Sequence, residues 1–189
     1  MTQITEEPQE MILTPIVHGW RVGHHAADKR RLLIKLIPST ETVDAWTHMV
    51  TLLATRDATV AAEPFIADLG ASFDPYCTKV ATQVWPAQTQ GGYSMQLGIV
   101  YCEVNRSTGI GEVVHVKVTK SEKTDALYVW QYARKIPGLV LAQDDESFTV
   151  EDLRSLVEAL RDHRPCILGD SQHSCPKGIE SPGKLAPTA

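Results

Sequence analysis

The chain has 189 residues, 43% of them apolar, which is long enough to bury a substantial core without help from a metal or a disulfide. Its 18 Lys and Arg residues face 23 Asp and Glu residues, so the formal net charge is -5. A net negative chain argues against a broad nucleic-acid-binding face, because phosphate binding depends on surplus positive charge. With 22% charged residues and this apolar content, the chain is not a wholly disordered one.

The N-terminal sequence lacks the features of a secretory signal, which begins with positive charge and continues with an apolar stretch. Its first charges are Glu6, Glu7 and Glu10, and Pro15 interrupts the apolar run that starts at Met11. No run approaches the roughly 20 apolar residues that span a bilayer. The sequence as written predicts a cytoplasmic protein without a membrane-spanning segment. The alternative is a periplasmic or secreted protein from which a signal has been removed.

The first half of the chain predicts two strands and a helix after a flexible N-terminus at residues 1–11. The apolar run at residues 31–37 ends at a proline and indicates a buried strand. The next segment predicts a helical turn at 39–45 followed by a strand at 46–55. Residues 61–76 carry aromatic and leucine side chains at four-residue intervals, which is typical of an amphipathic helix.

The second half predicts four strands and a second helix. Alternating apolar and polar residues, or turn signals at both ends, mark the strands at 78–85, 93–101, 113–119 and 126–135. Thr149 with Asp152 resembles a capping box, and the helix that follows it stops before Pro165. Residues 169–189 contain three glycines and three prolines and have little apolar content, so we expect a flexible C-terminal tail there.

These elements define an α+β fold in a single domain at residues 12–168. Strands joined by tight turns form an antiparallel sheet, and amphipathic helices need such a sheet to cover their apolar stripes. We therefore expect one sheet of about six strands packed against two helices.

The four cysteines form two candidate disulfide pairs, Cys77 with Cys102 and Cys166 with Cys175. For each pair the alternative is free thiols, and Cys102 alone is equally well explained as a small buried hydrophobe. Together with His163 and His173, the second pair also has zinc-ligand chemistry, but the spacing lacks the paired CxxC turn of established fingers. We therefore expect neither a metal nor another cofactor.

Tyr128, Trp130, Tyr132 and Arg134 form the candidate binding surface. Alternate residues of a strand point to one face of the sheet, so these four side chains share a face. Tyrosine, tryptophan and arginine are the residues enriched in interaction hot spots. The alternative is that both helices simply cover this face and bury its aromatic rings.

Three segments give the chain a resemblance to PsbP/Mog1-like proteins, which have an α/β/α sandwich fold. These are Leu32–Pro38, the Trp46-Thr47-x-Met49-Val50-Thr51 stretch, and Ala126–Val129, and the resemblance covers about residues 15–165. The resemblance implies a non-catalytic binding or assembly factor. It supplies no ligand residues that match position by position.

The leading functional hypothesis is a non-enzymatic binding or assembly module with a protein partner, such as an accessory component of a larger bacterial complex. It depends on the aromatic surface and on the lack of any catalytic motif in the sequence. The alternative is a small-molecule or lipid carrier with an apolar pocket between sheet and helices, flanked by Tyr93, Tyr101 and Phe73. An enzyme with a dispersed active site is the third and least favoured reading.

Overall fold

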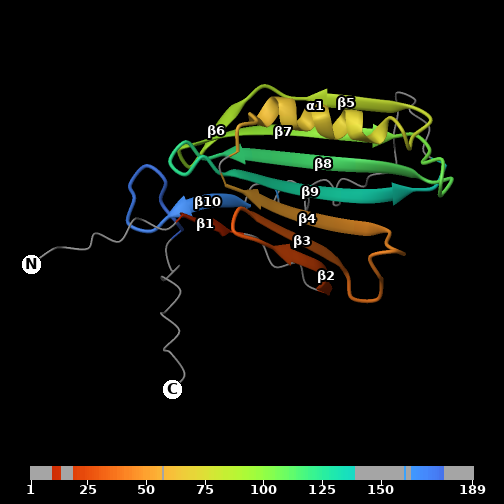
Figure 1. Cartoon of the computed structure of the whole chain (residues 1–189), viewed down its shortest axis with the longest axis horizontal. Helices are drawn as coiled ribbons and strands as arrows, with labels where there is room; N and C mark the ends of the chain where they lie inside the picture. Colours follow the sequence, from red (N-terminus) through yellow and green to blue (C-terminus); the bar gives the residue numbers. More distant parts are fainter. Residues whose placement is uncertain (1–9, 14–18, 57, 139–159, 161–162, 177–189) are drawn as a thin grey trace, which may run out of the picture.

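The structure, a computed structural model, describes residues 10–13, 19–56, 58–138, 160 and 163–176. Most of these residues belong to an eight-stranded antiparallel sheet with the order β2-β3-β4-β9-β8-β7-β5, and β6 pairs with β7 (Figure 1). Its strands are β2 (Trp20–Ala27), β3 (Arg31–Pro38), β4 (His48–Thr55), β5 (Val80–Val84), β6 (Gln88–Gln90), β7 (Tyr93–Cys102), β8 (Gly111–Lys120) and β9 (Leu127–Ile136). A second, two-stranded sheet pairs β1 (Glu10–Leu13) with β10 (Arg164–Ile167).

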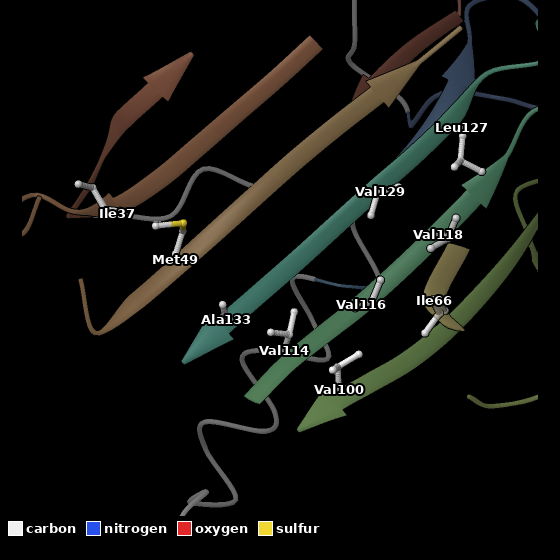
Figure 2. Close-up of a cluster of buried hydrophobic side chains, with 10 residues drawn as sticks. All are labelled: Ile37, Met49, Ile66, Val100, Val114, Val116, Val118, Leu127, Val129 and Ala133. Atoms are coloured by element: carbon white, nitrogen blue, oxygen red, sulfur yellow. The ribbon is translucent and has the colours of Figure 1, made fainter. Parts of the chain in front are cut away.

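One face of the large sheet carries α1 (Ala62–Phe73), which lies over β5, β7 and β8 (Figure 1). Ile66 of α1 is fully buried against valines that alternate along the strands. Figure 2 shows this core, in which strand residues on one face converge with the helix. Its members are Ile37, Met49, Ile66, Val100, Val114, Val116, Val118, Leu127, Val129 and Ala133.

The expected α+β fold with one six-stranded sheet and two helices is wrong. The described residues contain ten strands in two sheets and one helix with defined bounds. The predicted helix after Thr149 lies outside the described residues except at its end, where Leu160 is helical, His163 has no regular structure and Arg164 already belongs to β10. The turn predicted at 39–45 consists of bends and turns with no helix, and the strand that follows begins at His48.

The strands that sequence patterns miss are β1, β2, β6 and β10. β2 is an edge strand with mostly exposed residues on both faces, so it has no apolar alternation to reveal it. β1 and β10 are four residues each and pair across more than 150 positions of the chain. Pro165 occupies β10, where a two-stranded sheet tolerates proline because every strand is an edge.

Strand pairing reaches past the predicted domain borders at residues 12 and 168. β1 begins at Glu10 and pairs with Ile167 there. On the C-terminal side, Ser174 forms a bridge with Ile167, and the Ile167 amide donates to the His173 carbonyl at 2.7 Å. The segment after β10 therefore folds back onto that strand.

Candidate functional site

The four predicted surface residues lie on the face of the large sheet opposite α1, which we call the second face. Directly paired residues of neighbouring strands share a face, and the odd residues of β9 belong to the α1 side. Tyr128, Trp130, Tyr132 and Arg134 pair respectively with Thr119, Lys117, His115 and Val113 of β8. The expected alternation along β9 is therefore present in the structure.

The centre of the second face is filled rather than open. Trp130 is only 2% exposed and packs with Val50, and Leu160 lies against this pair. The Tyr132 ring stacks on Trp130 with a centroid distance of 6.3 Å, and its hydroxyl lies 2.7 Å from Nδ1 of His48. Trp130 thus stabilises the fold and is not accessible to a partner. Tyr128 lies at one end of the four predicted surface residues of β9.

A buried ammonium group lies next to Trp130. Lys117 is 1% exposed, and its Nζ donates to Oε1 of Gln90 at 2.5 Å and to the carbonyls of Leu160 and His163 at 2.5 and 2.8 Å. A buried charge is tolerable when hydrogen bonds replace its lost hydration. Lys117 therefore connects the chain at Leu160 and His163 to the large sheet.

A cavity of about 330 Å³ opens beside Tyr128, where β2, β3, β4 and β9 end and β1 crosses. Its floor is one cross-strand row on the second face, formed by Ala27, Leu32, Ala54 and Tyr128. The hollow exists because two members of this row are alanines, whose side chains are too short to fill the space between their neighbours.

Hydroxyl groups hold the carboxylate of Glu10 at one side of this cavity. The Ser121, Thr124 and Tyr128 hydroxyls donate to it at 2.7, 2.6 and 2.7 Å. Burial acts to raise the pKa of Glu10, but these hydrogen bonds outweigh it and lower the pKa below its usual value. Burial and the bond to Glu10 raise the pKa of Tyr128, so its phenol stays protonated as the donor.

Four cationic residues line the cavity: Lys29, Arg30, Arg31 and Arg56. All four residues are exposed. The turn that presents three of them is fixed by Asp28, whose Oδ1 accepts the backbone N–H groups of Arg30 and Arg31 at 2.7 and 2.8 Å. Those backbone hydrogen bonds lower the pKa of the Asp28 carboxyl.

Sequence reasoning missed this basic rim. The signal was the charged run Asp28-Lys29-Arg30-Arg31 between two strands, which a net negative composition made easy to overlook. Arg56 lies 25 residues further along the chain, and only the antiparallel pairing of β3 with β4 brings it beside that run.

Both candidate cysteine pairs are disulfides in the structure. Cys77 bonds to Cys102, with Cα atoms 5.5 Å apart, and connects the region after α1 to the end of β7. Cys166 bonds to Cys175, with Cα atoms 4.9 Å apart, and closes the segment after β10. The two histidines considered with this second pair have different surroundings. His163 is buried, and the His173 ring packs edge-on against Tyr93 with a centroid distance of 4.6 Å.

The aromatic residues of the carrier hypothesis lie in separate parts of the molecule. Phe73 joins the core beneath α1, whereas Tyr101 packs with Ile99 in another cluster. In the described part of the chain, no group of three or more His, Cys, Asp or Glu side chains could hold a metal ion. The described ranges also contain no helix with the length and apolar character needed to cross a membrane.

The fold, with its large antiparallel sheet and α1 on one face, is the Mog1/PsbP-like fold that the sequence resemblance predicted. No known protein family matches the sequence itself. No curated protein matches it either.

Among solved structures, the chain is similar to the Ran-binding protein Mog1p of Saccharomyces cerevisiae, with a TM-score of 0.53 and 13% identity over 83% of this chain and 92% of Mog1p. A Mog1 point mutant gives a TM-score of 0.45 at 13% identity, with 82% of this chain and 87% of that chain covered. LpqN of Mycobacterium tuberculosis, involved in cell envelope biogenesis, gives 0.40 at 13% identity, with 87% of each chain covered. At this identity the likeness to Mog1p establishes the fold alone.

Proposed function

We propose that this protein is a binding module that recognises a protein partner and serves as an accessory component of a larger complex. The observation that carries the proposal is the cavity beside Tyr128, which combines an apolar floor with an exposed rim of arginines. Arginine and tyrosine are over-represented among the residues that dominate binding energy at protein interfaces. The fold adds support, because Mog1p, which shares it, is a Ran-binding protein.

The size of the cavity favours a protein partner over the carrier hypothesis. About 330 Å³ is at the lower end of ligand-pocket volumes and suits one or two side chains rather than a whole lipid. Its rim is charged, whereas a carrier for an apolar ligand encloses that ligand in apolar side chains.

We also infer that the protein works outside the cytoplasm. The support is its two disulfides, because such bonds persist in oxidising compartments and are rare in reducing ones. This replaces the expectation of a cytoplasmic protein with its extracytoplasmic alternative. Alkylation of native protein, followed by mass measurement, should find no free thiol among Cys77, Cys102, Cys166 and Cys175. Four alkylated thiols would contradict the inference.

Site-specific photo-cross-linking in the source cell tests the binding function. A photoreactive residue replaces the exposed Ala27 on the cavity floor, and in a control protein it replaces Lys79 before β5, at the opposite edge of the sheet. We expect the Ala27 probe to give one defined polypeptide adduct that the Lys79 probe does not give. Identical adducts from both positions, or adducts only with small molecules, would overturn the proposal.

A further inference from the structure

The cavity beside Tyr128 carries more positive than negative charge. Four cations surround it, and its two carboxylates are those of Glu10 and Asp28. Both carboxylates are already engaged by neutral donors, Glu10 by three hydroxyls and Asp28 by two backbone N–H groups. Among the described residues, no carboxylate lies within ion-pair distance of Lys29, Arg31 or Arg56. Lys29 and Arg56 are therefore available to an external anion.

The rim stands over a floor that an apolar group can occupy. Ala27, Leu32 and Ala54 form most of this floor, and the half-buried Tyr128 ring closes it toward β1. Arginine guanidinium groups bind carboxylates through two parallel hydrogen bonds, which fixes the direction of the ligand as well as its charge. An occupant that fits has a carboxylate at the rim and an apolar neighbour on the floor.

We propose that the cavity binds an acidic, extended segment of the partner protein, in which Asp or Glu alternates with apolar residues. The inference rests on the proposed binding function and specifies the chemistry of the partner. One carboxylate side chain lies at Arg56, which is on the same face of the sheet as Ala54 and Tyr128, and an adjacent apolar side chain lies over Ala54.

The edge strand β2 favours a peptide over a lipid surface or a nucleic acid. β2 ends at Ala27, on the floor of the cavity, and is the first strand of the sheet order. In the described part of the chain, no strand pairs with its outer side. An extended peptide can add to this edge by backbone hydrogen bonds and lead its side chains into the cavity.

The net charge of the protein also favours a peptide over a lipid surface or a nucleic acid. The protein carries a formal charge of -5, so anionic bilayers and nucleic acids repel it as a whole. A short acidic segment that reaches into a concave site meets mainly the local rim, since charges beyond about 8–10 Å are screened at ordinary salt.

Fluorescence anisotropy with a labelled peptide of alternating Glu and Leu residues tests the inference. The control peptide has Gln in place of Glu, and both are titrated at about 50 mM and about 150 mM salt. We expect the acidic peptide to bind, the Gln peptide not to bind, and the higher salt to weaken binding. The double variant Lys29→Glu/Arg56→Glu should bind about tenfold more weakly or worse, because both cations are replaced by repelling charges.

Two further variants locate the effect. Lys79→Glu reverses one charge at the opposite edge of the sheet and should bind like the wild type. Ala54→Leu fills the floor without changing charge and should weaken binding several-fold. Thermal melts establish that each variant is folded. If the double reversal unfolds, Lys29→Gln and Arg56→Gln are measured singly and should each weaken binding.

Three results would overturn the inference: no binding of the acidic peptide, equal binding of the Gln peptide, or binding that the rim variants leave unchanged. Vesicles containing about 30% anionic lipid are the comparison arm, and rim-dependent binding to them without peptide binding would also overturn it. A partner captured by cross-linking through position 27, together with failure of the acidic peptide, would leave the binding function intact and reject only this partner chemistry.

Discussion

Lys117 places an ammonium group in the middle of the second face, where Trp130 is its cross-strand neighbour. Its hydrogen bonds to Leu160 and His163 connect the sheet to a part of the chain more than 40 residues away. Replacing a buried ion by an apolar residue is nearly neutral when its partners are replaced too. Here the acceptors are backbone carbonyls, which no substitution removes.

Lys117→Met is therefore expected to lower the free energy of unfolding by about 2–3 kcal/mol, since two buried carbonyls and the Gln90 amide lose their donor. Urea denaturation measures this loss. Lys79→Met, the same change at an exposed position, is the matched control and should stay within about 0.5 kcal/mol of the wild type. Equal stability of the two variants would show that the ammonium group contributes nothing net.

At the residue scale, the sequence predicts which side chains share a face but not which of them reach solvent. Alternation places Tyr128 and Trp130 together, yet one lines a cavity and the other is buried. The difference depends on Leu160 and on β1, which come from distant parts of the chain. Arg56 was missed for the same reason, because its role depends on strand pairing rather than on its neighbours in sequence.

The contact between α1 and β5 depends on a missing side chain. A Cβ atom at Gly70 would lie 2.1 Å from Oγ1 of Thr82 and 3.2 Å from its Cβ. The first separation is far below van der Waals contact and the second is tight, so any other residue here would force Thr82 or the helix to shift. Glycine lowers helix propensity by about 1 kcal/mol, and the close packing offsets that cost.

Gly70→Ala should destabilise the protein by about 1–3 kcal/mol, because overpacking outweighs the gain in helix propensity. Thr82→Ala removes the hydroxyl that the new methyl group would meet. The double variant should then recover most of the loss, which gives a clear coupling in a double-mutant cycle. Additive effects of the two substitutions on the midpoint of urea unfolding would contradict the proposed contact.

Element by element, periodicity succeeds where one face of an element is buried. α1 and the strands β7, β8 and β9 have such a face, and the predicted ranges fall within a few residues of the observed ones. β2 and β6 fail because they lie at the edge of the sheet or beyond its main path. β1 and β10 fail because their pairing is long-range and leaves no local pattern.

The free energy of unfolding should depend on pH through His115 and Glu112, because burial shifts the pKa values of these two side chains in opposite directions. Burial lowers the pKa of His115 from its ordinary value of 6.5 to about 4. As the pH falls, the unfolded chain therefore takes up a proton at His115 before the folded protein does. The contribution of His115 to stability is complete above about pH 6.5 and decreases as the pH falls toward 4. Burial raises the pKa of Glu112 to about 7, so its contribution is complete below about pH 4.5 and is lost as the pH rises through 7.

His115→Gln isolates one of these contributions. Relative to the wild type, the variant should lose less stability between pH 6.5 and 4, by about 1–3 kcal/mol, because glutamine takes up no proton. Urea titrations at several pH values across this interval measure the difference. Parallel curves for the two proteins would show that His115 is not buried in its neutral form.

The likeness to Mog1p establishes the fold, and the binding site that we propose depends instead on this chain's own charges around Tyr128. The most direct measurement is an NMR titration of isotopically labelled protein with the acidic peptide, followed at the backbone amides. The account predicts shifts confined to the turn Asp28–Arg31, Arg56 and the end of β2. Shifts concentrated at β5, at the opposite edge of the sheet, or no shifts at saturating peptide, would contradict it.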